Sequence, residues 1–245
     1  MGSDPKGHRP WDGNLSLSAK NRKRANKRNK KVSMALEATH MRFALDVKDN
    51  FTINDIAKYI QGTIYPDSRY VSGVNRNLTH NNNVLKPEFV TNDFNAGWHI
   101  HQLCDKIQRK IFYDNIPGFD KFPIDKYQED WWVASTAAKI IADMKDAQSF
   151  DIQSTLKYLN SETCPNGENI SSIQKYNQIT IGLYKGKIVP SVEDYIIMWN
   201  ELGVSEELCD KLRKMTEQFI NDGLSGIIWS CYAKMVNSFD KTKLV

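Results

Sequence analysis

Three residues with metal-ligand chemistry lie close together in the sequence, at His99, His101 and Cys104. On a helix, His101 and Cys104 share a face because they are three residues apart, whereas His99 points elsewhere. A tetrahedral metal site needs four ligands, and no second His/Cys cluster supplies the remaining ones. His80 joins this group only if folding brings it there. The spacing therefore favours packing or capping roles, and we expect neither a metal ion nor another cofactor.

A pair of carboxylates for acid–base chemistry is conceivable at Asp125, Glu129 and Asp130, just before two tryptophans. Acidic residues at this place also suit the start of a helix, where the helix dipole favours negative charge. We expect the second role. The sequence contains no P-loop, no dinucleotide-binding glycine motif, no nucleophile elbow and no zincin motif. The chain is therefore not expected to be an enzyme.

Positive charge is concentrated in residues 1–31, which hold ten Lys or Arg and two Asp and so carry +8. Since the whole chain carries +4, residues 32–245 carry −4. In the centre of this basic arm, residues 20–31, eight of twelve side chains are cationic, none is acidic and none is apolar and larger than Ala. The eight cations are Lys20, Arg22, Lys23, Arg24, Lys27, Arg28, Lys30 and Lys31.

Such a segment buries too little apolar surface to offset its ordering entropy, so we expect the arm to be disordered in the free protein. A polyanion changes this balance, because each neutralised phosphate releases a condensed counterion. Arginine adds bidentate phosphate contacts and stacking, and arginine-rich segments of this kind fold on RNA. A nuclear localisation signal or a patch for anionic lipid would have a similar composition. RNA is the predicted partner.

Hydrophobic patterns place the chain among proteins that neither cross a membrane nor enter the secretory route. No apolar run approaches the length that spans a bilayer, and residues 1–5 carry no signal-peptide core. We expect no membrane partner and no small-molecule substrate. The widely spaced cysteines predict free, largely buried thiols, at Cys104, Cys164, Cys209 and Cys231.

After residue 32 the pattern predicts a mostly α-helical core domain, residues 32–245, formed as one domain or as two lobes that meet near residues 160–190. The expected helices cover residues 34–45, 52–64, 93–113, 127–144, 152–159, 191–202, 205–223 and 224–239. The helix at 127–144 is apolar on nearly all sides and should be central and buried. The polar residues 66–92 predict a long loop. Alternation over residues 178–184 predicts a small β-hairpin, closed by Lys185-Gly186-Lys187.

Cations within the helical domain are further candidates for nucleic-acid contact, because a groove between two lobes would need them. These are Arg69, Arg76, Arg109, Lys110, Lys185 and Lys187. For each one singly, an ordinary solvated surface position explains the residue equally well. The tryptophans can stack on bases, but their helical spacing favours core positions for Trp98, Trp131, Trp199 and Trp229.

This layout resembles the coat proteins and nucleoproteins that coat RNA in helical assemblies: a basic arm, a helical domain and no catalytic motif. Residues 178–187, Gln-Ile-Thr-Ile-Gly-Leu-Tyr-Lys-Gly-Lys, and the helix 191–202 that follows are similar to the Thr-Ile-Gly stretch and following helix of orthobunyavirus nucleoproteins. The long arm departs from that family and is closer to plant-virus coat proteins. Flexible filamentous virus coat proteins share the helical core, but their conserved Arg and Asp have no clear counterparts here.

The resemblance implies subunits that each bind a fixed number of nucleotides through backbone contacts, without sequence readout. Neighbouring subunits would be linked by terminal segments, here residues 33–60 or 224–245, in filaments or rings. It also implies a place in a virion and the host cytoplasm; a non-viral protein of this kind would be cytoplasmic or nuclear. A monomeric nucleic-acid-binding regulator is the main alternative, and a nucleic-acid-processing enzyme tethered by its arm is the third.

Overall fold

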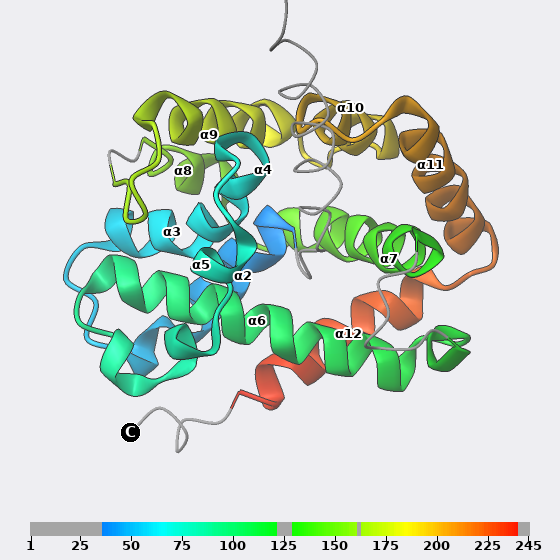
Figure 1. The fold of residues 1–245 in the computed structure, drawn as a ribbon. Coiled ribbons are helices and arrows are strands. Elements are labelled where there is room, and N and C mark those ends of the chain that lie inside the picture. Colours follow the sequence, from blue (N-terminus) through cyan, green and yellow to red (C-terminus); the bar gives the residue numbers. More distant parts are fainter. Residues whose placement is uncertain (1–35, 122–128, 161–162, 240–245) are drawn as a thin grey trace, which may run out of the picture. The chain divides into compact units, whose positions relative to one another are not determined.

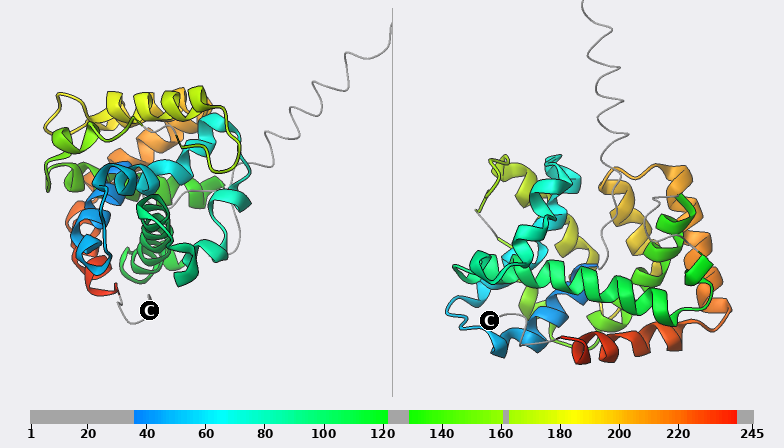
Figure 2. Two further views of the ribbon diagram at one scale, coloured as in Figure 1. Left: turned by 90° about the vertical axis from the view of Figure 1, so that its left-hand side faces the viewer. Right: turned by 60° about the horizontal axis from the view of Figure 1, so that its bottom comes forward.

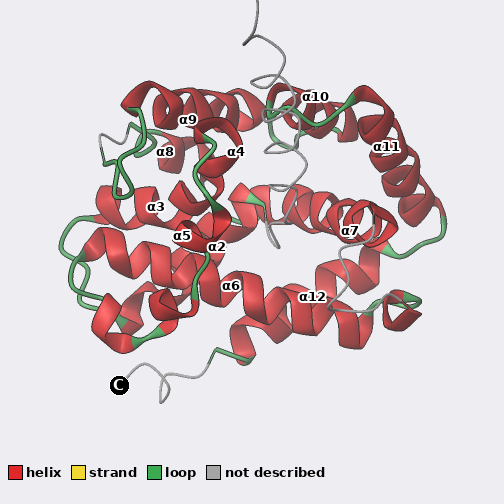
Figure 3. Cartoon of the chain, viewed as in Figure 1, coloured by secondary structure: helices red, strands yellow, loops and turns green. Residues whose placement is uncertain are grey.

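The computed structural model describes residues 36–121, 129–160 and 163–239. These belong to the second of two units into which the chain divides, Val32–Val245, and the first unit, Met1–Lys31, lies outside them. The described residues form helices joined by turns and short loops, and none of them lies in a strand (Figure 3). The mostly helical fold predicted from the sequence is confirmed. Within this part of the chain, no helix combines the length and the apolar character needed to cross a bilayer.

Four helices that contribute to the largest hydrophobic core lie close together in the fold (Figure 1). They are α2 (Glu37–Val47), α3 (Ile56–Ile64), α6 (Asp93–Asn115) and α7 (Glu129–Ala147). Every residue of α7 from Val133 to Asp143 is buried. Its alanines leave room for helices on several sides at native packing density. The predicted central helix is therefore confirmed, while residues 122–128 at its predicted start, Asp125 included, lie outside the described part.

Helices α3 and α6 touch backbone to backbone at two glycines. A Cβ atom on Gly62 would lie 1.9 Å from the carbonyl oxygen of Phe94, and one on Gly97 would lie 1.9 Å from that of Tyr59. Only glycine fits at such distances, because real Cβ atoms stay beyond about 3 Å. This approach brings the side chains of α6 against the carbonyl groups of α3, which matters for the site described below.

The predicted long loop at residues 66–92 is wrong, because the segment folds into a chain of short helical turns. Asparagines start two of them: the Asn75 side chain accepts a hydrogen bond from Asn77 N, and Asn81 accepts one from Asn83 N. The polar composition thus encodes caps rather than irregular backbone. The turns are η2 (Tyr65–Ser68), α4 (Arg69–Ser72), α5 (Arg76–Thr79), η3 (Asn82–Leu85) and η4 (Pro87–Phe89).

The predicted β-hairpin is also wrong, since residues 178–184 lie in α9 (Ile170–Tyr184). The alternation of Ile179 and Ile181 is real, but the buried positions follow helical spacing: Ile173, Tyr176, Asn177, Thr180, Leu183 and Tyr184. The Asn169 side chain caps the helix by accepting from Ser171 N. Packing of that stripe outweighs the β-propensity of the isoleucines.

The C-terminal part follows its predicted pattern closely. Ser191 and Asp194 form the two reciprocal bonds of a capping box at the start of α10 (Val192–Glu201). Helices α9 and α10 lie on one side of α7, and α12 (Ser225–Asn237) lies on the other (Figures 1 and 2). The remaining elements are α8 (Ile152–Leu156), α11 (Glu206–Asn221), η1 (Lys48–Asn50) and η5 (Phe119–Lys121).

Three of the four tryptophans expected in the core are buried, at Trp98, Trp131 and Trp199. The prediction that Trp229 lies in the core is wrong. The residue is 45% exposed, although its Nε1 donates to the Ile141 carbonyl oxygen at 3.0 Å. All four cysteines are free; three are buried and Cys164 is half-buried.

Candidate functional site

The structure separates the predicted nucleic-acid contacts into three groups. The eight cations of residues 20–31 lie outside the described residues. Lys110 and Lys185 are exposed on the surface, and Lys187 is half-buried. Arg69, Arg76 and Arg109 lie deeper: Arg69 is only 5% exposed, and the other two are half-buried.

Arg69, Arg76 and Arg109 lie near Lys139 of α7, a residue that is only 2% exposed. Burial lowers the pKa of Arg76, and the charge of Arg69 lowers it further. Burial also lowers the pKa of Lys139 to about 7, opposed by Asp105 and Asp67 and assisted by Arg109 and Arg76. Lys139 was not a predicted site residue. Its signal in the sequence is a single cation within an otherwise small and apolar helix.

Two of the surface lysines are paired within the chain. Lys110 Nζ contacts Asp114 at 2.5 Å, and Lys187 Nζ contacts Asp194 at 2.7 Å. Lys187 and Asp194 belong to the rim of an open pocket of about 610 Å³ between α9 and α10, which Lys175 and Glu201 also line. With two lysines and two acids, this pocket carries no net positive charge to attract a polyanion.

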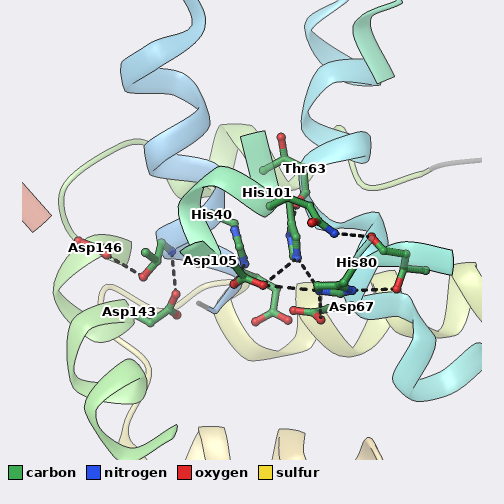
Figure 4. Close-up of polar contacts among 12 residues, drawn as sticks. His40, Thr63, Asp67, His80, His101, Asp105, Asp143 and Asp146 are labelled. Atoms are coloured by element: carbon green, nitrogen blue, oxygen red, sulfur yellow. Dashed lines mark hydrogen bonds and ion pairs between the residues drawn. The ribbon is translucent and has the colours of Figure 1, made fainter. Parts of the chain in front are cut away.

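Four side chains with ligand chemistry converge beside the buried cations (Figure 4). His80 Nε2 and His101 Nε2 lie 3.2 Å apart. Asp105 Oδ2 lies 3.6 Å from His80 Nε2 and 3.7 Å from His101 Nε2. Asp67 Oδ1 lies 3.7 Å from His80 Nε2. All four side chains are at most 8% exposed, so the cluster is shielded from solvent.

Different elements supply these residues. His101 and Asp105 stand one turn apart on α6, Asp67 lies in η2, and His80 directly follows α5. His40 of α2 stacks on the His101 ring, with centroids 3.8 Å apart, and its Nε2 lies 3.5 Å from Asp105 Oδ1. Two overlapping groups of three potential metal ligands result, and both contain His101.

Backbone and hydroxyl groups orient the two facing imidazoles. His101 Nδ1 lies 2.8 Å from the Thr63 carbonyl oxygen, which can only accept, so Nδ1 carries the proton. His80 Nδ1 lies 2.8 Å from Thr79 Oγ1, which is also 3.3 Å from the Arg76 carbonyl oxygen. His101 Nε2 therefore presents a lone pair to His80 Nε2 at 3.2 Å.

Burial sets the charge of the histidines around this cluster. It lowers the pKa of His80 well below its ordinary value, helped by the charge of Arg76. Burial likewise lowers the pKa of His40, and the neighbouring His101 lowers it further. Both rings are accordingly neutral near pH 7.

Asp143 and Asp146 form a second buried acidic cluster, and both carboxylates accept hydrogen bonds from other side chains or the backbone. Asp143 of α7 accepts from Thr39 N at 2.7 Å, from Tyr184 Oη at 2.5 Å and from Tyr195 Oη at 2.8 Å. Asp146 accepts from Thr39 Oγ1 and Arg42 Nη1, each at 2.7 Å. Since α2 has no side-chain cap of its own, Asp143 satisfies an amide at its N-terminus from another helix.

Burial raises the pKa values of the acids in this region. Burial raises the pKa of Asp146 to about 7, and it raises the pKa of Asp143 as well. The pKa of Glu37 rises to about 8, first because of burial and then because of the charge of Asp143. Tyr176 Oη donates to Glu37 Oε1 at 2.5 Å and lowers that pKa in turn.

Sequence reasoning found only part of this centre. It named His80, His101 and Cys104, but Cys104 is buried away in the hydrophobic core, and His99 Nδ1 is bonded to the Val84 carbonyl oxygen at 2.6 Å. Asp67, Asp105 and His40 were missed. The separation of four on α6 between His101 and Asp105 is the one signal that could have joined two of them.

No protein-family model, curated protein or solved structure matches this chain.

Proposed function

We propose that this protein binds RNA without sequence readout and coats it by self-assembly, as a nucleocapsid or coat protein does. The observation that carries the proposal is the composition of residues 20–31, with eight cations among twelve residues and no acid. Only a dense external anion neutralises so many adjacent charges, and nucleic acid gains counterion release from each phosphate that is contacted.

The charge of the helical unit supports this assignment by contrast. Residues 32–245 carry −4, and many of their cations are held by acids of the same unit. Examples are Arg42 with Asp146 at 2.7 Å and Lys211 with Glu129 at 2.7 Å. The centre of the arm contains no acid and the helical unit carries a net negative charge, so the arm is the stronger attractor of a polyanion.

Arg76 and Arg109 are the best supporting contacts within the helical unit. Both are half-buried and lie beside Arg69 and Lys139. Four cations face two acids there, Asp67 and Asp105, so the group keeps a positive balance that favours a phosphate at its edge. We assign Lys110 and Lys187 a lesser role, because each forms a one-to-one pair with a single acid.

Self-association has support from apolar side chains left on the surface. Ile188 is 87% exposed, Ile197 is 52% exposed and Trp229 is 45% exposed. Trp229 and Ile227 lie on α12, within the segment 224–245 that would link neighbouring subunits in such an assembly. Burial of such residues between copies would remove apolar area from water at about 25 cal/mol per Å².

The test uses two full-length variants with the same net charge. One replaces the eight cations of residues 20–31 by Gln. The other replaces eight exposed lysines of the helical unit by Gln, at positions that are not proposed contacts: Lys58, Lys86, Lys106, Lys121, Lys145, Lys157, Lys175 and Lys214. Each variant changes the net charge from +4 to −4.

We expect the wild type and the second variant to copurify with RNA and to bind random and defined RNA equally well. The arm variant should lose this binding and purify free of nucleic acid. Negative-stain imaging before and after ribonuclease should show assemblies that collapse on digestion. Equal loss in both variants would show a general charge effect and contradict the proposal.

The regulator alternative predicts a different result in the same assay. A monomeric regulator would discriminate between sequences, so random RNA would compete poorly against its site. A processing enzyme would degrade or modify the bound RNA over time. Sequence-independent competition with intact RNA therefore separates the proposed coat protein from both.

A further inference from the structure

We propose that His80, His101, Asp105 and Asp67 bind one divalent transition-metal ion, and that Zn²⁺ matches this set best. The site is independent of the RNA-binding role. It would tie the segment of short helical turns at residues 65–89 to the long helix α6.

Distances between the ligand atoms carry the proposal. A tetrahedral Zn²⁺ holds nitrogen and oxygen ligands at about 2.0–2.2 Å, which separates any two of them by about 3.3–3.6 Å. Around His80 Nε2, the donors of His101, Asp105 and Asp67 lie at 3.2, 3.6 and 3.7 Å. Ordinary ion pairs between these groups would close to about 2.7–2.9 Å. The spacing therefore matches the ligand separations around one shared cation.

The orientation of the two imidazoles supports the same conclusion. His101 Nδ1 donates to the Thr63 carbonyl oxygen, so the lone pair of its Nε2 faces His80 Nε2 at 3.2 Å. A metal ion between the two rings requires the His80 tautomer that is protonated at Nδ1, and Thr79 Oγ1 at 2.8 Å can accept that proton. Metal-bound histidines are typically held in this manner, with the remote nitrogen donating to a carbonyl or another fixed acceptor.

The fold presents the ligands from rigid positions. The contact of Gly97 with α3 fixes α6 close enough for His101 to reach the Thr63 carbonyl. Asp105 follows His101 by four residues and shares its helix face. Imidazole favours Zn²⁺ and its neighbours in the transition series, whereas Mg²⁺ and Ca²⁺ prefer oxygen ligands alone.

Neighbouring charges set limits on the affinity. Arg69 Nη2 lies 3.6 Å from Asp67 Oδ1, and buried Lys139 faces the same carboxylates. These cations compete with the metal for Asp67 and Asp105. His40, stacked on His101, offers a further nitrogen near Asp105, and its ring nitrogens have no hydrogen bond among the described residues. His40 would replace Asp67 as a metal ligand if Asp67 remains paired with Arg69.

The experiment uses full-length protein, stripped with a chelator and then dialysed. Titration with Zn²⁺ in a calorimeter gives the stoichiometry and affinity, and Co²⁺ serves as a coloured probe of tetrahedral geometry. We expect one equivalent of either ion and intense visible absorption from bound Co²⁺. Substitutions His80→Gln and His101→Gln should each weaken binding by about 100-fold or more.

His99→Gln is the matched control. His99 is also buried, lies on α6 two residues before His101 and donates to a backbone carbonyl, yet it lies outside the cluster. This variant should bind Zn²⁺ and Co²⁺ as the wild type does. Circular dichroism checks that each variant is folded, and Asp67→Asn and Asp105→Asn provide shape-preserving replacements if a histidine variant unfolds.

Three results would overturn the proposal: a folded wild type that binds neither ion, binding that survives the loss of His80 and His101, or equal loss in the His99 control. The first would leave a proton, rather than a metal ion, between the two imidazoles. The second would place the metal elsewhere, for example at the histidine in residues 1–31.

Discussion

The basic arm and the helical unit use charge in opposite ways. Residues 1–31 carry +8, with their cations crowded into one run, whereas residues 32–245 carry −4. Within the helical unit, several charged side chains are buried, among them Lys139, Arg69, Asp105 and Asp143. The difference teaches that buried charges of the helical unit serve its own architecture, whereas the central run of the arm contains no acid that could pair with its cations.

The same contrast recurs inside the helical unit. Asp143 and Asp146 accept hydrogen bonds from hydroxyls, an amide and Arg42 at 2.5–2.8 Å. The cluster at His80 and His101 instead keeps its donors 3.2–3.7 Å apart. The first set of distances is that of direct hydrogen bonds, and the second matches the ligand separations of the metal ion proposed above.

The largest expected effect comes from breaking the complete cluster. Asp143→Ala leaves the Thr39 amide and the hydroxyls of Tyr184 and Tyr195 buried without their acceptor. At about 1–3 kcal/mol for each group, we expect a loss of about 3–6 kcal/mol in the free energy of unfolding. Urea unfolding measures it. Asp49→Ala, at an 87% exposed side chain, should change stability by less than about 0.5 kcal/mol.

Next in size is the helix contact that positions the metal ligands. Gly97→Ala would place Cβ 1.9 Å from the Tyr59 carbonyl oxygen, so α3 and α6 must separate. We expect a loss of about 3 kcal/mol, at the upper end for overpacking, together with weaker Zn²⁺ binding. Gly226→Ala is the control, since nothing lies within 4 Å of its Cβ. It should be neutral or stabilising, and equal effects of the two changes would refute the close contact.

A smaller effect concerns the arginines at the edge of the buried cations. The double substitution Arg76→Gln and Arg109→Gln should weaken RNA binding by roughly tenfold or less, while lowering its salt dependence by about one phosphate contact per residue. Filter binding at several salt concentrations measures this. Lys58→Gln with Lys106→Gln, two exposed lysines, is the control. A loss as large as that of the arm variant would place the principal RNA site in the helical unit.

The smallest effect is a change in pH dependence at Glu37. Its raised pKa means that the folded protein holds this proton more tightly than the unfolded chain. The contribution to stability is complete below pH 4.5 and is lost as the pH rises through about 8. Glu37→Gln removes that loss, so the difference between wild type and variant should change by up to about 1.4 kcal/mol per pH unit between about pH 6 and 8. Parallel curves would contradict the pKa shift.

Local signals predicted much of the fold, and tertiary contacts decided the rest. The capping box of Ser191 and Asp194 and the apolar character of α7 depend on neighbours in sequence, so both were predictable. The predicted hairpin was wrong because the alternation over residues 178–184 covers fewer residues than the helical stripe of buried residues, which runs from Ile173 to Tyr184. The loop predicted for residues 66–92 was wrong because asparagine is common both in helix caps and in loops.

The buried centre was less accessible to sequence reasoning. Its ligands come from η2, from the end of α5 and from α6, and only His101 and Asp105 are near in sequence. What joins them is the contact of Gly62 and Gly97 with the facing backbones. A glycine gives no hint of its partner in the sequence, so the meeting of His80 with His101 required the folded structure.

The salt dependence of RNA binding tests the central claim most directly. For a single-stranded RNA, the logarithm of the association constant falls with the logarithm of salt concentration by about 0.7 for each phosphate neutralised. If the arm supplies the contacts, the wild type and the variant with eight surface lysines replaced should share a slope of about −4 to −6. The variant with eight arm cations replaced should bind weakly, with a slope of about −1 to −2 that reflects the remaining contacts of Arg76 and Arg109. A steep slope and wild-type affinity in that last variant would contradict the account.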